Sequence, residues 1–249
     1  MLEHIKNAPW IWCNRDPKQD EYGEFVDEFP YESGVVTLQI SADSNYATYI
    51  NGKLAAWGQY ADFPYDKVYD EVDVTKFCRK GTNRIAIIVW YYGLESSSVY
   101  YPGKAGLVYA LACNDEVLRQ SSAATLSRMS PAYQNHRCKM LSGQLGFGYG
   151  YDATKEDNWL IGELNGFAPS VIIEQTLPLR IRPCDKLTLL PEVVGIPCKQ
   201  LSETDMIFDL GSEQVGFLSL KLSSSCEQNI NISYGEHLTD SRVRRIIGD

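Results

Sequence analysis

Carboxylate side chains are the most direct candidates for acid–base chemistry in this sequence. Hydrolysis of a glycosidic bond needs two carboxylates facing each other across the bond, about 5.5 Å apart for retention of configuration and about 6.5–9.5 Å apart for inversion. The visible candidates are Asp70, Glu71 and Asp73 in "YDEVD", Glu156 and Asp157 in "KEDNW", and Glu236 in "YGEHL". The first two runs are typical of solvated faces and turns, and the sequence does not show which of these carboxylates could form a pair. We therefore assign no catalytic residue.

Aromatic side chains in loops are the second chemical signal, because sixteen Tyr and five Trp raise the aromatic share to 12%. A sugar ring exposes apolar C–H faces on which Trp and Tyr planes stack, while polar neighbours bind its hydroxyl groups. Loop tips on a rigid scaffold are where binding residues concentrate. The predicted carbohydrate-binding residues are Trp57, Tyr60, Tyr65, Tyr101 and Asp152.

Packing is the alternative role for these aromatic residues. Trp and Tyr fill the core of a β-sandwich while their polar tips reach the surface. We expect this role for Trp10, Trp12 and Trp90.

Nucleotide, metal and cofactor chemistry are disfavoured by the motifs. "GQLGFGYGYD" has glycines spaced by two, but "YDATKEDNW" after it is a poor opening for the helix that a dinucleotide fingerprint requires. We expect a loop or extended strand there. The seven Cys form no CxxC pair and the three His are far apart in sequence, so we expect neither a disulfide framework nor a metal site. We predict no cofactor.

The charge and hydropathy of the chain limit its partners. A net charge of −9 argues against nucleic acid and against electrostatic docking to anionic membranes. No run is long enough to span a bilayer, and "MLEHIKNAPWIWC" lacks the apolar region of a secretory signal. We expect a soluble protein, either cytoplasmic or periplasmic or secreted with its signal removed.

Period-2 alternation and turn signals predict the elements that would position these loops. An Asn51-Gly52 turn between two alternating runs predicts a type I′ hairpin, and Asn114-Asp115 predicts another. The apolar run from Ile85 to Tyr92 reads as a buried central strand. In "DKVYDEVD", Asp70 is expected to face water.

These signals predict an all-β chain of two domains. Residues 1–175 should form a jelly-roll-like, galactose-binding-like β-sandwich. Residues 176–249 should start a second, incomplete β-sandwich, with strands at 217–222 and 230–234.

Two sets of motifs resemble known families. "YATYINGKLAAWG" followed by "DVTKFCRKGTNRIAIIVWYYG" resembles the jelly-roll sandwich that precedes the catalytic domain of many glycoside hydrolases. "FDLGSEQVGFLSLKL" followed by "NISYGEHLTDSRVRR" resembles the N-terminal portion of a bacterial α-L-rhamnosidase of glycoside hydrolase family 78. The order and spacing of the motifs match over roughly residues 8 to 245. Two loops depart from the family pattern, at Asp152-Ala153-Thr154 and at Gly211-Ser212-Glu213-Gln214.

The resemblance implies a part of a larger enzyme. Family members continue into an α/α barrel that carries the catalytic acids, and this chain contains no such segment. The leading hypothesis is the non-catalytic N-terminal part of an α-L-rhamnosidase, which supports the barrel of the same polypeptide and contacts rhamnose-containing plant polysaccharide. The alternatives are a free-standing carbohydrate-binding module and a structural interaction module with an exposed apolar patch near its C-terminal strands.

The absence of a paired acid and base in the motifs predicts that the chain alone is inactive. We expect no hydrolysis of an aryl α-L-rhamnoside by the purified chain, measured by release of the aryl group. Robust turnover by homogeneous protein would overturn this expectation.

Overall fold

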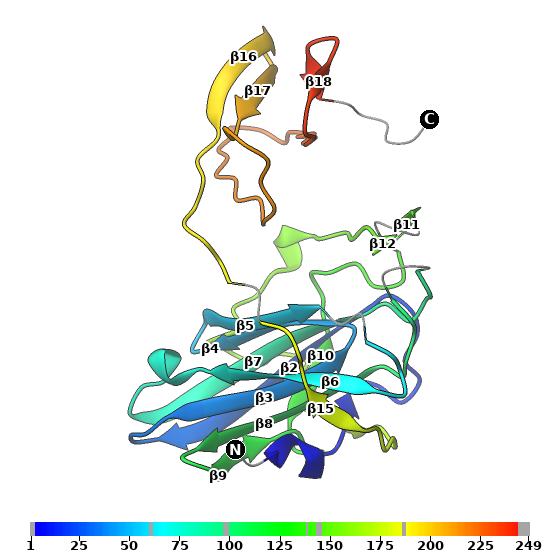
Figure 1. Cartoon of the computed structure of the whole chain (residues 1–249), viewed down its shortest axis with the longest axis vertical. Coiled ribbons are helices and arrows are strands. Elements are labelled where there is room, and N and C mark those ends of the chain that lie inside the picture. The colour runs from blue at the N-terminus through cyan, green and yellow to red at the C-terminus, as the bar shows by residue number, and fades with distance from the viewer. Residues whose placement is uncertain are drawn as a thin grey trace. The chain divides into compact units, whose positions relative to one another are not determined.

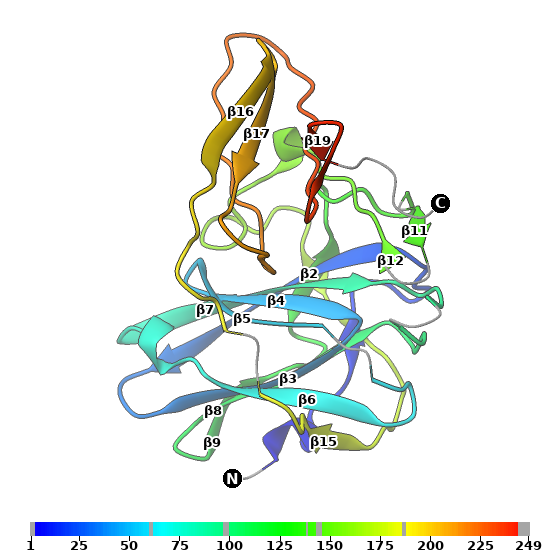
Figure 2. The same ribbon diagram turned by 45° about the horizontal axis from the view of Figure 1, so that its top comes forward.

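A computed structural model describes residues 3–59, 62–96, 100–137, 139–142, 146–185 and 188–243. The chain divides into two compact units, Met1–Lys186 and Leu187–Asp249. The first unit is built from two facing β-sheets, which Figure 2 shows as two layers. The expected all-β class is therefore confirmed. The expected division at residue 175 stays a prediction.

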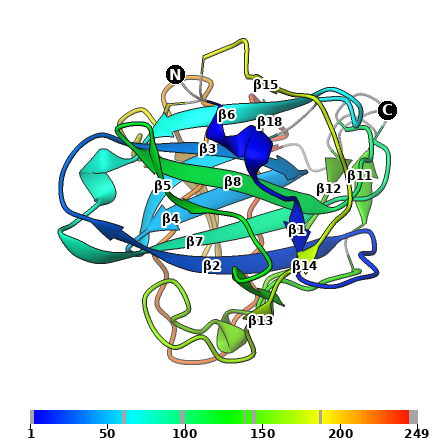
Figure 3. The same ribbon diagram turned by 90° about the horizontal axis from the view of Figure 1, so that it is seen from below.

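The first sheet of unit 1 has seven strands. Its order is β14 (Val171–Ile172), β1 (Ile11–Trp12), β8 (Gly106–Cys113), β3 (Val36–Asp43), β6 (Lys67–Asp73) and β15 (Leu179–Ile181), with β9 (Glu116–Gln120) also paired to β8. The short 3-10 helix η1 (His4–Asn7) lies over β3 and β8 on the outer face of this sheet (Figure 3).

The second sheet of unit 1 has six strands. Its order is β13 (Ala168–Pro169), β10 (Leu126–Met129), β2 (Glu21–Tyr31), β7 (Gly81–Tyr91), β4 (Asn45–Ile50) and β5 (Lys53–Gln59). A separate ladder joins β11 (Met140–Ser142) to β12 (Gly146–Phe147), and two further 3-10 helices are η2 (Thr75–Phe77) and η3 (Ala153–Lys155) (Figure 1). The glycine-rich segment is thus extended at β12, as predicted.

The core between the two sheets is apolar and fully buried. Its largest side chains come from alternate positions of both sheets, and they include Trp12, Phe25, Phe29, Ile40, Ile50, Ile85, Ile87 and Tyr109. Burying each of these side chains stabilises the fold by roughly 1.5–3 kcal/mol relative to leaving it exposed to water. The two-residue periodicity of the strands explains why the predicted central strand, found as β7, buries Ile85 and Ile87 on one face.

The two predicted hairpin turns are confirmed. Asn51 and Gly52 have φ of 51° and 78°, as a type I′ turn requires, and they join β4 to β5. The Asn51 side chain adds hydrogen bonds to the Phe77 carbonyl and to Asn83, at 3.0 and 2.8 Å. Asn114 and Asp115 also have positive φ and join β8 to β9.

Two expectations about burial are wrong. Asp70 is only 4% exposed, because its carboxylate accepts hydrogen bonds from the Tyr46 hydroxyl at 2.8 Å and from Arg182 at 2.5 Å. Trp10 and Trp12 are buried as predicted, but Trp90 is half-buried and packs outside the main core. Its indole N–H donates to the Asp20 carboxylate at 3.0 Å.

Unit 2 contains two short antiparallel ladders. They pair β16 (Ile196–Ser202) with β17 (Asp205–Asp209), and β18 (Leu238–Thr239) with β19 (Arg242–Val243). The strands predicted at 217–222 and 230–234 are not formed, and their apolar side chains are exposed. Alternation gives a segment one apolar face, but a strand also needs a neighbour that pairs its backbone groups. Within the described part of the chain, no helix is long and apolar enough to cross a membrane.

Candidate functional site

Three exposed aromatic rings lie together at one end of the sandwich of unit 1. Phe63 and Tyr65 are stacked, with ring centroids 5.3 Å apart and an interplanar angle of 13°. Tyr101 packs against Phe63 with centroids 5.7 Å apart. The exposed fractions of Phe63, Tyr65 and Tyr101 are 45%, 67% and 46%. We call these three side chains the aromatic platform.

The platform is carried by two loops. Phe63 and Tyr65 lie between β5 and β6, where the Asp66 amide donates to the Phe63 carbonyl at 3.1 Å and closes a tight turn. Asp66 also pairs with Arg180 at 3.1 Å on the surface. Tyr101 lies in the loop that leads into β8.

A buried lysine anchors the first loop. The Lys67 ammonium is 2.7 Å from one oxygen of Asp62 and 3.4 Å from Asp43, and its side chain is only 3% exposed. The other oxygen of Asp62 accepts the Val68 amide at 2.9 Å. Asp62, which directly precedes Phe63, is thus fixed to the first residues of β6.

Asp43 anchors the second loop as well. Its carboxylate accepts a short hydrogen bond from the Tyr100 hydroxyl, and Tyr100 directly precedes Tyr101. Burial raises the pKa of the Asp43 carboxyl above its ordinary value, and the neighbouring Lys67 opposes this rise. Burial and the charge of Asp43 together raise the pKa of the Tyr100 hydroxyl, which is therefore a donor at neutral pH.

Gly103 lets the two loops approach each other. A Cβ atom at this position would lie 2.4 Å from Asp43 Oδ2 and 3.4 Å from Pro64 Cβ. Any side chain here would displace the carboxylate that both loops share.

A row of aromatic rings in stacked and edge-to-face contact leads up to Tyr100. The ring order is Tyr151, Tyr133, Tyr22, Trp90, Tyr92 and Tyr100, with successive centroids 4.8, 4.4, 5.0, 4.5 and 5.2 Å apart. We call this row the aromatic ladder. Sequence reasoning missed it because its members come from β2, β7 and three loops. Strand register, which no local pattern fixes, places Tyr22 opposite Trp90, and the loops add the other rings.

The structure places the predicted binding residues differently. Tyr65 and Tyr101 meet through Phe63, a loop aromatic that the sequence prediction did not assign to the site. Trp57 is half-buried on β5 opposite Ala47, and its indole N–H is buried without a hydrogen-bond acceptor among the described residues. Tyr60 lies outside the described residues.

Asp152 lies in a different loop and serves a local role. Its carboxylate accepts hydrogen bonds from the Thr154 amide at 3.1 Å and the Thr154 hydroxyl at 2.6 Å, capping η3. The bond from the Thr154 side chain also lowers the pKa of Asp152. Its role in carbohydrate binding stays a prediction.

The platform presents aromatic surface without a free carboxylate beside it among the described residues. Its nearest carboxylates, Asp43, Asp62 and Asp66, are each bonded to Lys67 or Arg180, so they hold loops in place. The rings offer flat apolar surface together with two tyrosine hydroxyls, which suits the C–H face and hydroxyl groups of a sugar. Among the described residues, no three His, Cys, Asp or Glu side chains gather as metal ligands do.

Solved structures provide the comparison with known proteins, since no protein-family model and no curated protein matches the chain. A family GH78 rhamnosidase of Bacillus sp. GL1 is similar with 26% identity and a TM-score of 0.64, over 71% of this chain and 20% of that one. α-L-Rhamnosidases of Dictyoglomus thermophilum and Aspergillus terreus match in fold, with TM-scores of 0.57 and 0.55 and identities of 17% and 18%.

These matches confirm the resemblance that the sequence motifs indicate. They cover 85% and 72% of this chain for the second and third structures, but only 26% and 23% of those proteins. The chain therefore spans about a fifth to a quarter of the length of the rhamnosidases it resembles. The chain is thus similar in fold to a part of each of these longer rhamnosidases.

The geometry predicts that Lys67 is the main anchor of the platform. In Lys67→Met, two buried carboxylates lose their cation, so we expect a loss of about 3–5 kcal/mol in the free energy of unfolding. Urea unfolding followed by tryptophan fluorescence measures it, because all five Trp lie in unit 1.

The matched control is Arg180→Met, which breaks the exposed pair with Asp66. Surface ion pairs contribute little to stability, so this variant should unfold close to the wild type. Equal losses in the two variants would contradict the anchoring role of Lys67.

Proposed function

We propose that the chain is the non-catalytic N-terminal portion of an α-L-rhamnosidase and that its sandwich binds carbohydrate through the aromatic platform. The observation that carries the proposal is the set of three exposed, mutually packed rings of Phe63, Tyr65 and Tyr101. Large exposed apolar groups that are fixed by buried contacts are typical of binding surfaces. The similarity to a rhamnosidase supports the choice of a sugar as ligand.

The proposed mode of binding is stacking without bond cleavage. The stacked Phe63 and Tyr65 rings and the tilted Tyr101 ring offer two differently oriented faces. The buried contacts of Asp43 and Lys67 fix both loops before the ligand arrives, so little conformational entropy is lost on binding. The ligand class is a neutral sugar of a rhamnose-containing plant polysaccharide.

Removing a platform ring should weaken sugar binding. In Tyr65→Ala and Tyr101→Ala we expect about three- to tenfold weaker binding of a neutral rhamnosyl-glucose disaccharide, since an aromatic contact contributes about 0.5–1.5 kcal/mol beyond area burial. Titration followed by NMR chemical shifts measures the dissociation constant in each variant.

Tyr234→Ala is the matched control, because Tyr234 is 88% exposed and lies in unit 2. This variant should bind like the wild type. Absence of binding by the wild type, or an equal loss in all three variants, would contradict the proposed site.

A second candidate function is that of an interaction module, and unit 2 carries the observation that favours it. Apolar side chains are highly exposed along the alternating segments, with Val215 at 99%, Phe217 at 77% and Tyr234 at 88%. Exposed apolar patches of this kind mark interaction sites or association-prone surfaces. The proposed partner is a further domain of the same polypeptide.

This candidate predicts self-association of the isolated chain. Sedimentation velocity over a range of protein concentrations should show oligomers that decline in the double variant Phe217→Ser/Tyr234→Ser. Tyr149→Ser in unit 1 is the control and should associate like the wild type. A wild-type chain that stays monomeric at every concentration would contradict this prediction.

A further inference from the structure

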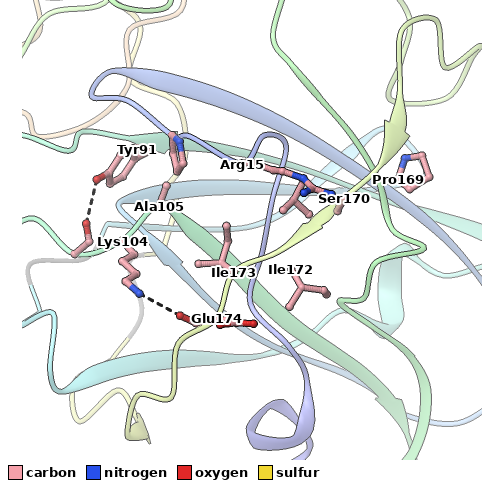
Figure 4. Close-up of a pocket in the computed structure, with 12 residues that line it drawn as sticks. Arg15, Tyr91, Lys104, Ala105, Pro169, Ser170, Ile172, Ile173 and Glu174 are labelled. Atoms are coloured by element: carbon pink, nitrogen blue, oxygen red, sulfur yellow. Dashed lines mark hydrogen bonds between the residues drawn. The ribbon is translucent and has the colours of Figure 1, made fainter.

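A groove next to the loop that carries Tyr101 is lined by charged side chains, unlike the aromatic platform. It has a volume of about 920 Å³ and lies between the β1–β2 loop, the end of the loop that leads into β8 and the segment that contains β13 and β14 (Figure 4). Its lining includes the side chains of Arg15, Tyr91, Lys104, Ser170, Ile172 and Glu174.

The walls of this groove are fixed by hydrogen bonds. The Tyr91 hydroxyl donates to the Gly103 carbonyl at 3.0 Å, and the Ile173 amide donates to the Trp10 carbonyl at 2.8 Å. The buried Ser170 hydroxyl donates to the Thr125 carbonyl at 2.7 Å. The groove is therefore formed before any ligand binds, and closing on a ligand requires little rearrangement.

The charge of the groove is opposite to that of the whole protein. Its lining contains two cations, Arg15 and Lys104, and one anion, Glu174, which leaves a formal charge of +1 in a chain of net charge −9. Arg15 is exposed and forms no ion pair within the described residues. The Lys104 ammonium is bonded to the Glu174 main-chain carbonyl at 3.1 Å, so its charge is not neutralised there.

We propose that this groove binds the negatively charged group of an acidic sugar, a carboxylate or a sulfate ester. Arg15 offers a planar fork of N–H donors that matches either group, and Lys104 offers a second positive charge. Figure 4 shows the two cations on different sides of Ile173, and the exposed Ile172 side chain supplies apolar surface for a ring.

The same loop serves both sites. Tyr101 of the platform and Lys104 of the groove are three residues apart, so their Cα atoms are within about 11 Å of each other by chain length alone. This spacing is within the reach of a short oligosaccharide that carries one neutral unit and one acidic unit. The choice of a carbohydrate as carrier of the anion rests on the proposed function.

The test compares acidic and neutral forms of one sugar. The probes are trigalacturonic acid, its fully methyl-esterified form, which has the same rings without charge, and galactose 6-sulfate, each titrated calorimetrically into the wild-type chain. We expect the free acid to bind about tenfold more tightly than the ester, the ratio that corresponds to 1.4 kcal/mol. Galactose 6-sulfate shows whether a sulfate ester replaces the carboxylate.

The variants locate the site. Arg15→Gln should weaken binding of trigalacturonic acid about tenfold and Lys104→Gln about threefold, in line with charge-assisted hydrogen bonds. The matched control is Lys80→Gln, which removes the same charge just before β7 begins at Gly81. Tyr91, which lines the groove, is at the other end of this strand, about 33 Å away at about 3.3 Å per residue. The Lys80→Gln variant should bind like the wild type.

Three results would overturn the proposal: no binding of either acidic probe, equal binding of the acid and its ester, or an equal loss in the Lys80→Gln control. Binding of the neutral rhamnosyl-glucose disaccharide in the same preparation separates the two hypotheses. If the neutral sugar binds and the acidic probes do not, the groove proposal fails alone.

Discussion

The buried ammonium of Lys67 is the interaction on which the candidate site depends. Removing a cation and two carboxylates from water costs several kcal/mol per ion, so the cluster is a poor source of stability by itself. It does fix geometry, because Asp62 leads into Phe63 while Asp43 also binds the hydroxyl of Tyr100, next to Tyr101. One cation thereby sets the relative positions of two loops that are about 40 residues apart in sequence.

Stacking and charge are divided between neighbouring surfaces of unit 1. The carboxylates close to the platform point inward to Lys67 or pair with Arg180, which leaves aromatic rings at the surface. Arg15 and Lys104 line the adjacent groove without a carboxylate partner among the described residues. An acidic protein can therefore present one local surface that does not repel an acidic ligand, since charges beyond about a Debye length of 8–10 Å are screened.

Local chemistry predicted the parts of the fold that are themselves local. The turn at Asn51-Gly52 and the strand that contains Ile85 are determined by residues close to them in sequence, and both are found as predicted. The burial of Asp70 and the aromatic ladder depend on which strands are neighbours, and this information lies in residues distant in sequence. Tyr65 and Tyr101 could be proposed as loop aromatics, but their meeting through Phe63 follows from the buried ions beneath them. The segment 217–222 shows the reverse case, alternation without a partner strand.

The segment from β13 to β15 determines when the sandwich can be completed during synthesis. Within fourteen residues it pairs with β10 in one sheet and with β1 and β6 in the other, so it joins elements made early and late. Strand β1 pairs with Val171 and Ile172, about 160 residues downstream. A ribosome adding about 5–20 residues per second therefore leaves one edge of β1 unpaired for roughly eight to thirty seconds. During that interval the growing chain exposes a sheet edge. Both sheets have all their strands only once residue 181 has left the exit tunnel.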